Sequence, residues 1–246
     1  MKRVNWRFFY LSILCSLICA CVTPNTNLSK DNKLIPERGD RSSANQLIKN
    51  DFDRIADVEL YENTQSLRRL MLKLYKRNPH ELAKSTSDSA EKMVDWVFDG
   101  DSQHHYQFIG IDNKQGTAAI FLAFNADYQG DRVLPFIVGL QTMLLKAHGN
   151  KIEFYLTDRI DPQSIYNVAR NIEIAAWKLS NSRDLSGRLY LLSNEINTTD
   201  HNLSFEREFG KMIGRTDLYA ISLAEKSQRL ISRVMQSIAT AVFLPF

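Results

Sequence analysis

The sequence predicts a mainly α-helical fold: a single multi-helix domain over residues 44–246, with a long C-terminal helix and at most two short strands. Apolar residues recur at steps of three and four along most of this region, which is the spacing of one face of a helix. Residues 106–111 and 151–157 are the candidate strands, and the first could instead be a turn and the second a short helix. Arg188–Ser193 is short and apolar and could be a helix or a strand. The region contains no cysteine, so a hydrophobic core must stabilise it, and about 200 residues can bury one.

Three helices are predicted in the first part of the domain. Apolar stripes lie over about 44–56, Asn63–Arg77 and Ser87–Asp99. The second helix should end at Asn78, because the residue before Pro79 avoids helical backbone. Ser87 is expected to cap the third helix, and Gly100 to end it.

The two most apolar stretches of the domain are Thr117–Ala126 and Val133–Leu145. They predict a helical hairpin that is buried as a central layer. Each stretch is well short of the roughly 20 residues that span a bilayer. Pro135 lies in the first turn of the second helix, where proline is tolerated. The same hairpin could line a cavity as readily as fill a core.

The remainder of the domain is also predicted to be helical. Asp161 and Pro162 indicate a helix start, since Asp caps a helix and Pro is tolerated in its first turn. A short helix over about 204–214 is expected to precede the longest one, over about 216–243. The apolar residues 241–246 are expected to dock on the domain itself.

The beginning of the chain predicts a secretory signal followed by a lipid anchor. Residues 1–20 combine a basic start with an apolar run that is too short to span a membrane. Ile18-Cys19-Ala20-Cys21 has an aliphatic residue, a tolerant position, a small residue and a cysteine, and so resembles the lipobox of bacterial lipoproteins. This resemblance covers only residues 1–22, and it implies that Cys21 is acylated and becomes the first residue of the mature protein.

The same resemblance implies a location. Val22 follows the cysteine, whereas Asp at this place retains enterobacterial members of the family in the inner membrane, so the outer membrane is favoured. Residues 21–43 contain two prolines and little to bury, which predicts a flexible tether of about 25 Å. The helical domain over 44–246 would then face the periplasm, attached to the bacterial cell envelope by its lipid. No family is recognised for that domain.

The charge of the chain argues against nucleic acid as a partner. The whole sequence has 31 basic and 28 acidic residues. Lys2, Arg3 and Arg7 lie in the predicted signal, and without these three basic residues 28 remain against 28 acidic ones. A neutral domain lacks the basic footprint that phosphate backbones attract.

One basic cluster is nevertheless a candidate site. No acidic residue lies between Glu62 and Glu81, and this interval contains Arg68, Arg69, Lys73, Lys76 and Arg77. These side chains could contact an anionic surface such as lipid head groups. The alternative is a solvated helix face whose positive end suits the helix dipole.

No pattern in the sequence predicts a catalytic residue, a metal site or a cofactor. His104 and His105 have acidic neighbours, but adjacent residues of an extended chain point to opposite sides, and no other His stands at a ligating offset. Glu206 and Glu208 are two positions apart and therefore face different sides of a helix. Neither a Gly-x-Ser-x-Gly motif nor a Gly-rich phosphate loop is present.

Two classes of function follow from these patterns, and a third stays open. The anchor, the tether and the neutral charge favour a non-enzymatic interaction or assembly protein of the envelope, with a protein partner. The apolar hairpin alternatively favours a carrier of a lipid or another apolar ligand. A large dry pocket would indicate the carrier, whereas a solid core with an exposed apolar patch would indicate the interaction protein. A cell-wall hydrolase is third, and it would need carboxylates that converge in a cleft.

Overall fold

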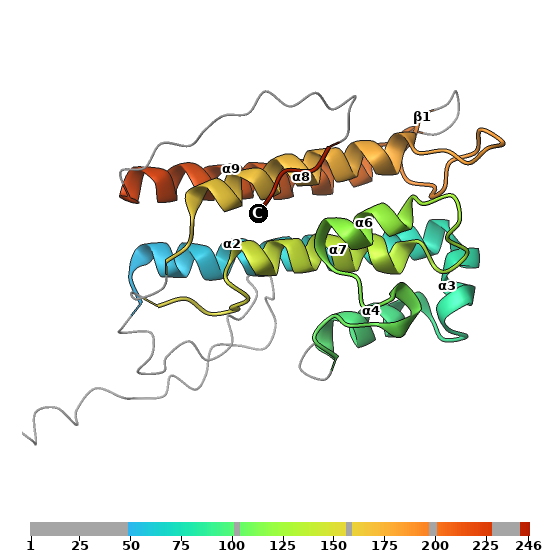
Figure 1. The fold of residues 1–246 in the computed structure, drawn as a ribbon, viewed down its shortest axis with the longest axis horizontal. Helices are drawn as coiled ribbons and strands as arrows, with labels where there is room; N and C mark the ends of the chain where they lie inside the picture. Colours follow the sequence, from blue (N-terminus) through green and yellow to red (C-terminus); the bar gives the residue numbers. More distant parts are fainter. Residues whose placement is uncertain (1–48, 101–103, 156–158, 197–200, 228–241) are drawn as a thin grey trace, which may run out of the picture. The chain divides into compact units, whose positions relative to one another are not determined.

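The computed structural model confirms the mainly helical fold (Figure 1). It describes residues 49–100, 104–155, 159–196, 201–227 and 242–246. These residues contain seven α-helices, one 3-10 helix and two strands of two residues each, all within one compact unit, Leu47–Phe246. The predicted signal peptide, Cys21 and the tether lie outside the described residues.

Helix α2, Asp51–Arg77, is a single helix of 27 residues, so the prediction of two helices here is wrong. Asn50 caps it in a capping box with Asp53, whose side chain accepts from the Asn50 backbone N–H. The helix continues because its buried face passes without a break through Glu59 and Leu60. No glycine or proline interrupts this interval.

Pro79 ends one helix and begins another. Asn78 is the C-cap of α2, as predicted, but Pro79 then occupies the first turn of α3, Pro79–Ser85, a helix that the sequence pattern did not reveal. Helix α4, Ala90–Asp99, is capped by Ser89 instead of Ser87, because the buried face begins at Ala90. Gly100 is its C-cap, as predicted.

The strands lie where the sequence did not predict them. Residues 106–111 form a turn that ends in the 3-10 helix η2, Ile109–Ile111, and residues 151–155 are neither strand nor helix. Residues 156–158 lie outside the described residues. The strands are instead β1, Glu195–Ile196, and β2, His201–Asn202, which pair antiparallel with Glu195 opposite Asn202.

The predicted apolar hairpin is present as α6, Gly116–Ala123, and α7, Val133–Ala147. The two helices approach each other closely at Gly139. A Cβ atom on Gly139 would lie 2.6 Å from the Gly116 carbonyl oxygen and 2.6 Å from Cγ1 of Ile120, so only glycine fits there. Pro135 lies in the first turn of α7, as predicted.

Two long helices complete the fold. Helix α8, Pro162–Asn181, begins with Asp161 as its cap and Pro162 in its first turn, as predicted. Helix α9, Ser204–Ser227, passes Gly214 without a break, so the prediction of a separate helix from Thr216 is wrong. Gly lowers helix stability by about 1 kcal/mol, and the continuous buried face before and after Gly214 outweighs this cost. Residues 228–241 lie outside the described residues. Val242 and Phe243, the predicted end of this helix, are not helical. Residues 242–246 dock on the domain, as predicted.

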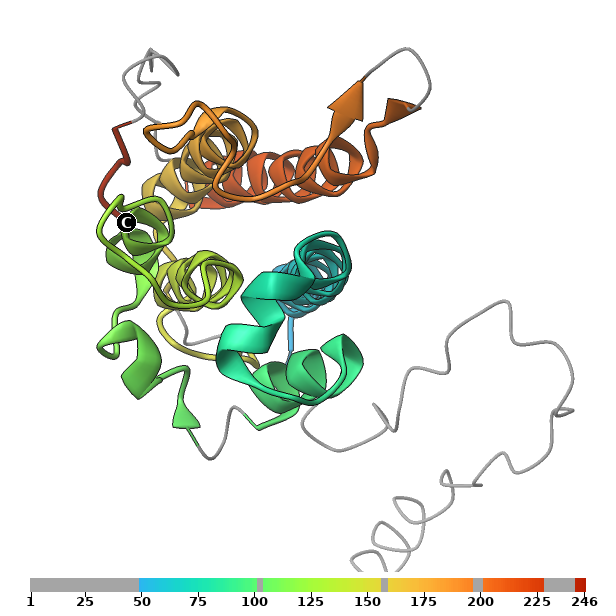
Figure 2. The same cartoon turned by 90° about the vertical axis from the view of Figure 1, so that its right-hand side faces the viewer.

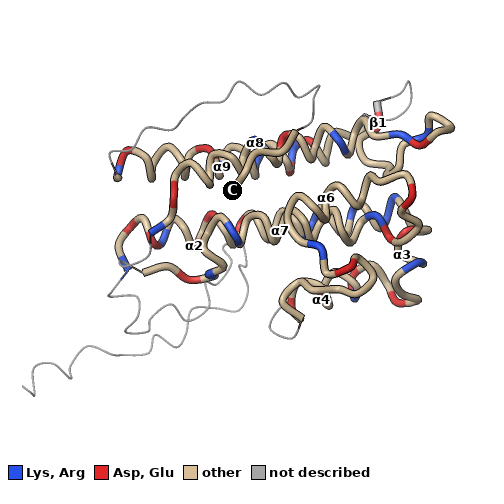
Figure 3. The backbone as a smooth tube through the Cα atoms, viewed as in Figure 1, with Lys and Arg blue, Asp and Glu red and all other residues tan. Residues whose placement is uncertain are grey.

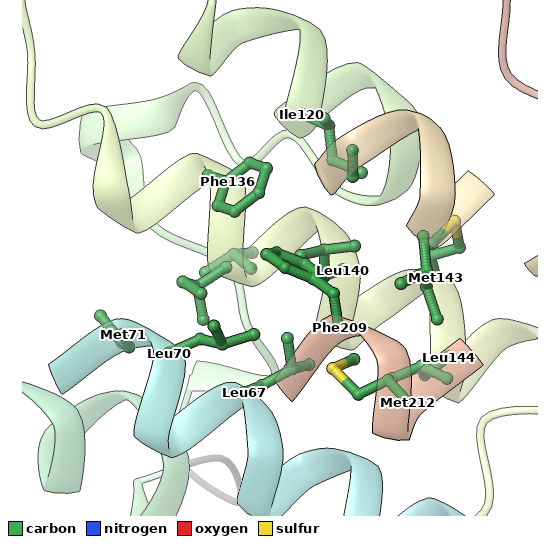
Figure 4. Close-up of a cluster of buried hydrophobic side chains, with 14 of the residues drawn as sticks. Leu67, Leu70, Met71, Ile120, Phe136, Leu140, Met143, Leu144, Phe209 and Met212 are labelled. Atoms are coloured by element: carbon green, nitrogen blue, oxygen red, sulfur yellow. The ribbon is translucent and has the colours of Figure 1, made fainter. Parts of the chain in front are cut away.

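The helices are arranged in three tiers (Figures 1 and 2). Helices α8 and α9 lie side by side in one tier, α2, α7 and α6 form the middle tier, and α3 and α4 lie on the other side of it. The core is solid where α2, α7 and α9 meet (Figure 4). Its fully buried side chains include Leu67, Leu70, Phe136, Leu140, Phe209 and Met212.

None of the helices in the described part of the chain combines the length and the apolar character that are needed to cross a bilayer.

Candidate interaction surface

The five cations that the sequence singles out lie along α2, and we call them the cation stripe: Arg68, Arg69, Lys73, Lys76 and Arg77. Figure 3 shows that basic and acidic residues are interspersed along the helices. Arg68 contacts Asp95 at 2.7 Å and also Asp99, both on α4. Lys76 lies 2.8 Å from Glu91, near the start of the same helix. Arg68 and Lys76 therefore pair α2 with α4.

The middle of the stripe faces α9. Arg69 lies 3.1 Å from Glu208, which also pairs with Lys211 at 3.0 Å. Burial alone would raise the pKa of Glu208, but the hydrogen bonds from Lys211 and Arg69 outweigh it and hold this pKa below its usual value. The Lys73 ammonium lies 4.6 Å from the centre of the Phe205 ring, and burial lowers its pKa despite the nearby Glu208.

Arg77 completes the pattern with an ion pair of 2.6 Å to Glu195 on β1. Acidic residues from α4, α9 and β1 thus lie against the cation stripe, although the sequence around the stripe contains none. The stripe joins α2 to its neighbours, and its cations are not gathered into an open basic surface.

A second set of charges is buried between α2, α7 and α9. Nδ1 of His148 donates to the Leu144 carbonyl at 2.8 Å, and Nε2 lies 3.0 Å from Oε2 of Glu59. The other Glu59 oxygen accepts from Asn63 at 2.6 Å and from Thr216 at 2.7 Å. Both ring nitrogens of His148 therefore lie close to oxygen atoms. The side chains of His148, Glu59, Asn63 and Thr216 are all buried. Their mutual contacts therefore fix how the three helices align.

A buried arginine holds the turn between α6 and α7. The guanidinium of Arg132 donates to the carbonyls of Ala123 at 2.8 Å, Asn125 at 2.9 Å and Tyr128 at 2.6 Å. The backbone N–H of Arg132 donates to Oε2 of Glu81 on α3 at 2.6 Å. Such charge-assisted bonds are the strong ones, so this turn has a fixed conformation.

Asp131 attaches the same turn to α2 and α3. Its Oδ2 accepts from the Tyr75 hydroxyl at 2.6 Å and from the Ser85 hydroxyl at 2.7 Å, and its Oδ1 accepts from the Val133 N–H at 2.9 Å. Burial raises the pKa of Asp131 although these bonds favour its charged form. Burial and the Asp131 charge both raise the pKa of the Tyr75 hydroxyl.

The loop over residues 104–115, which precedes α6, is held in an unusual conformation. In the described part of the chain, four of the five non-glycine residues with a positive φ angle lie in it: His105, Tyr106, Asp112 and Asn113. Nδ1 of His104 accepts from the Tyr106 N–H at 2.9 Å, and its Nε2 lies 3.2 Å from the Trp96 carbonyl. Both nitrogens of His104 are therefore used to shape the loop, and no cluster of three metal-binding side chains occurs among the described residues.

Residues of α3, α4, this loop and α7 line a groove of about 670 Å³. We call it the Trp96 groove, and its apolar lining is Met93, Trp96, Phe108, Ile109 and Leu134. The ring centres of Trp96 and Phe108 are 5.0 Å apart. Trp96 remains 51% exposed and Ile109 90% exposed. The Tyr128 hydroxyl donates to the Gly110 carbonyl at 3.1 Å, which ties the tip of the loop to the α6–α7 turn.

The carboxylates that could have served a hydrolase have other partners. Glu206 accepts from the side-chain amide of Asn194 at 2.9 Å, while the buried Glu208 pairs with Arg69 and Lys211. The two carboxylates therefore belong to different contacts. The apolar hairpin of α6 and α7 is packed as core at Gly139 and Ile120.

Comparison with known proteins yields no relative for this chain. No family model matches the sequence, and neither a curated protein nor a solved structure shows significant similarity to it. A function must therefore be argued from the arrangement of the side chains.

Proposed function

We propose that this chain is a lipid-anchored envelope protein, and that its helical domain binds a partner protein through the Trp96 groove. One observation carries the proposal: the half-exposed Trp96 of α4 and the nearly fully exposed Ile109 of η2 line the same groove. Exposing such side chains costs free energy, and a partner that covers them would recover it.

The composition of the groove supports a protein as the occupant. Tryptophan is among the residues that contribute most to protein interfaces, especially beside a pocket that an apolar side chain can fill. The rim of the groove contains both signs of charge, and Lys92 pairs there with Asp88 at 3.0 Å. An apolar centre with a polar, nearly neutral rim is the usual anatomy of a protein interface. We infer that the partner inserts an aliphatic or aromatic side chain beside Trp96.

The proposed lipid anchor would hold this binding surface close to the membrane. The lipobox resemblance supports acylation of Cys21, and Val22 supports the outer membrane, with the domain in the periplasm. A flexible tether over 21–43 would keep the domain within about 25 Å of the lipid while leaving it free to turn. A domain tethered in this way meets membrane-bound partners at a raised effective concentration.

The test is to purify the protein from its own membrane in mild detergent and to compare the unaltered chain with three variants. The mass at Cys21 reports the acyl chains, with Cys21→Ser as the control. The Trp96→Ser/Ile109→Ser variant should bind its partner at least tenfold more weakly than the unaltered chain. Leu185→Ser removes a fully exposed aliphatic side chain from another loop and should retain the partner.

Two results would each remove one part of the proposal. An unmodified chain at Cys21 would remove the anchor. A partner that is retained equally by the Trp96→Ser/Ile109→Ser variant and by Leu185→Ser would remove the groove.

A further inference from the structure

The residues Val242–Phe246 form an extended segment that lies between α8 and α6, and we call it the strap (dark red in Figures 1 and 2). Oδ1 of Asn171 accepts from the Leu244 N–H at 2.6 Å, and Nδ2 of Asn171 donates to the Leu244 carbonyl at 2.8 Å. Nδ2 of Asn167, one helical turn earlier on α8, donates to the Pro245 carbonyl at 2.8 Å.

These bonds recognise main chain. Asn171 satisfies both the N–H and the C=O of one residue, as a neighbouring strand would do, and this recognition is independent of the side chain of that residue. Asn171 is itself 0% exposed. If the strap left, the oxygen and the nitrogen of the buried Asn171 side-chain amide would lose these hydrogen bonds. Another extended chain could supply them again.

The side chains of the strap occupy two separate places. The Phe243 ring packs edge-on against Phe121 of α6, with ring centres 5.0 Å apart. Phe246 lies close to Gly116, where an added Cβ atom would come within 3.0 Å of its ring. The groove beside Phe246 has a volume of about 590 Å³, so it has room beyond this ring. The site thus selects two aromatic side chains that are three positions apart.

The strap covers this site only in part. Val242 is 60% exposed and Pro245 is also exposed, while Phe243 and Phe246 are half-buried. Two lysines lie over the aromatic rings: the Lys178 ammonium is 6.0 Å from the centre of Phe243, and the Lys146 ammonium is 5.1 Å from the centre of Phe246. These cations favour aromatic rings and a neutral or acidic chain.

We propose that the surface formed by α8 and α6 is a peptide-binding site for an extended segment of a partner protein with an aromatic-x-x-aromatic pattern, and that the strap occupies this site in cis as a competing ligand. The site is separate from the Trp96 groove, and the inference goes beyond the proposed function because it needs neither Trp96 nor the lipid anchor. A partner segment would bind when it displaces residues 242–246.

The experiment measures binding of a fluorescein-labelled peptide with the sequence of residues 242–246 by fluorescence anisotropy. The Phe243→Ala/Phe246→Ala form of the full chain weakens the strap and should bind the peptide at least tenfold more tightly than the unaltered chain. Adding Asn171→Leu should abolish this gain, because it removes the main-chain bonds. Asn181→Leu is the matched control, since Asn181 lies on the same helix and contacts Trp177 instead of the strap.

Three outcomes would overturn the proposal. The first is a folded Phe243→Ala/Phe246→Ala form, judged by circular dichroism, that binds the peptide no better than the form with Asn171→Leu. If that form does not fold, hydrogen exchange of the unaltered chain replaces the test: excess peptide should speed exchange at the Leu244 amide, and an unchanged rate contradicts displacement. The third is a dimer of the unaltered chain that the peptide dissociates, since a second copy would then be the occupant.

Discussion

The cation stripe of α2 and the Trp96 groove use their surface side chains in opposite ways. The four stripe cations Arg68, Arg69, Lys76 and Arg77 each contact a carboxylate from another element, and Lys73 lies over an aromatic ring. In the groove, Trp96 and Ile109 remain exposed although hydrogen bonds to Gly110 and Tyr106 hold the loop that contains Ile109. The difference teaches that in this domain charge at the surface holds helices together, whereas exposed apolar side chains are what a partner can use.

If this comparison is correct, substitutions in the polar contacts of α2 should lower stability, and substitutions in the groove should lower binding. The expected change in the free energy of unfolding decreases from His148 through Arg68 and Glu208 to Ile109.

The largest change is expected at His148. His148→Leu removes the ring that lies 3.0 Å from the buried Glu59 side chain, and a buried acidic group that loses its partner should lower the free energy of unfolding by about 3–5 kcal/mol. Adding Glu59→Leu removes this unpartnered acidic group and should recover part of the loss. Urea denaturation of the two variants checks both statements. A double variant that is less stable than His148→Leu would contradict the coupling of the two side chains.

A smaller loss is expected within the cation stripe. Arg68→Met removes contacts to Asp95 and Asp99 and should cost about 1 kcal/mol, because these pairs are largely exposed. A double-mutant cycle with Asp99→Asn should show a coupling energy of about 0.5 kcal/mol. Binding of the partner should not change. A variant with unchanged stability and weakened attachment to anionic vesicles would instead support a role for the stripe in lipid contact.

The third prediction concerns pH. The pKa of Glu208 in the folded chain lies below its unfolded value of about 4.3, so the folded state favours the charged form. Its contribution to stability is therefore fully present above about pH 4.3 and is lost as the pH falls through the folded pKa. Glu208→Gln should reduce stability at pH 6.5 by about 1 kcal/mol or less, and the difference from the unaltered chain should shrink at pH 3. Equal differences at the two pH values would exclude this ion pair as the cause.

The smallest change in stability is expected in the groove. Ile109 is 90% exposed, so Ile109→Ser should alter the free energy of unfolding by less than about 0.5 kcal/mol. The same variant should weaken partner binding at least tenfold. Thermal denaturation and a binding titration measure the two effects on one sample. A loss of stability as large as that of Arg68→Met would mean that Ile109 serves the fold.

The sequence predicted correctly several places where a helix begins or ends at a capping residue, a proline or a glycine, because these effects depend only on neighbouring residues. Asp161 with Pro162 begins α8, Gly100 ends α4, and the apolar hairpin of α6 and α7 is in place with Pro135 in its first turn. The continuity of α2 could not be predicted, because its polar residue Glu59 is stabilised by partners from distant helices.

The candidate surfaces depended on distant contacts even more. The acidic residues that pair with the cation stripe come from other segments of the sequence. The sequence around the stripe therefore gave no sign of these ion pairs. No pattern in the sequence indicated that Trp96 and Ile109 share one groove, because they lie on different elements and only the fold brings them to the same surface. Nothing in the sequence distinguishes Asn171 from other polar residues of α8. Its role follows only from its two hydrogen bonds to Leu244 in the folded chain.

The most direct test is site-specific photo-crosslinking in the native envelope, with a benzophenone amino acid placed at Ile109 or, as the comparison, at Lys76. We predict one discrete crosslinked protein from position 109, its loss when Trp96→Ala is added, and no such product from position 76. The same product from both positions, or a product from position 76 alone, would contradict the claim that the Trp96 groove is the binding surface.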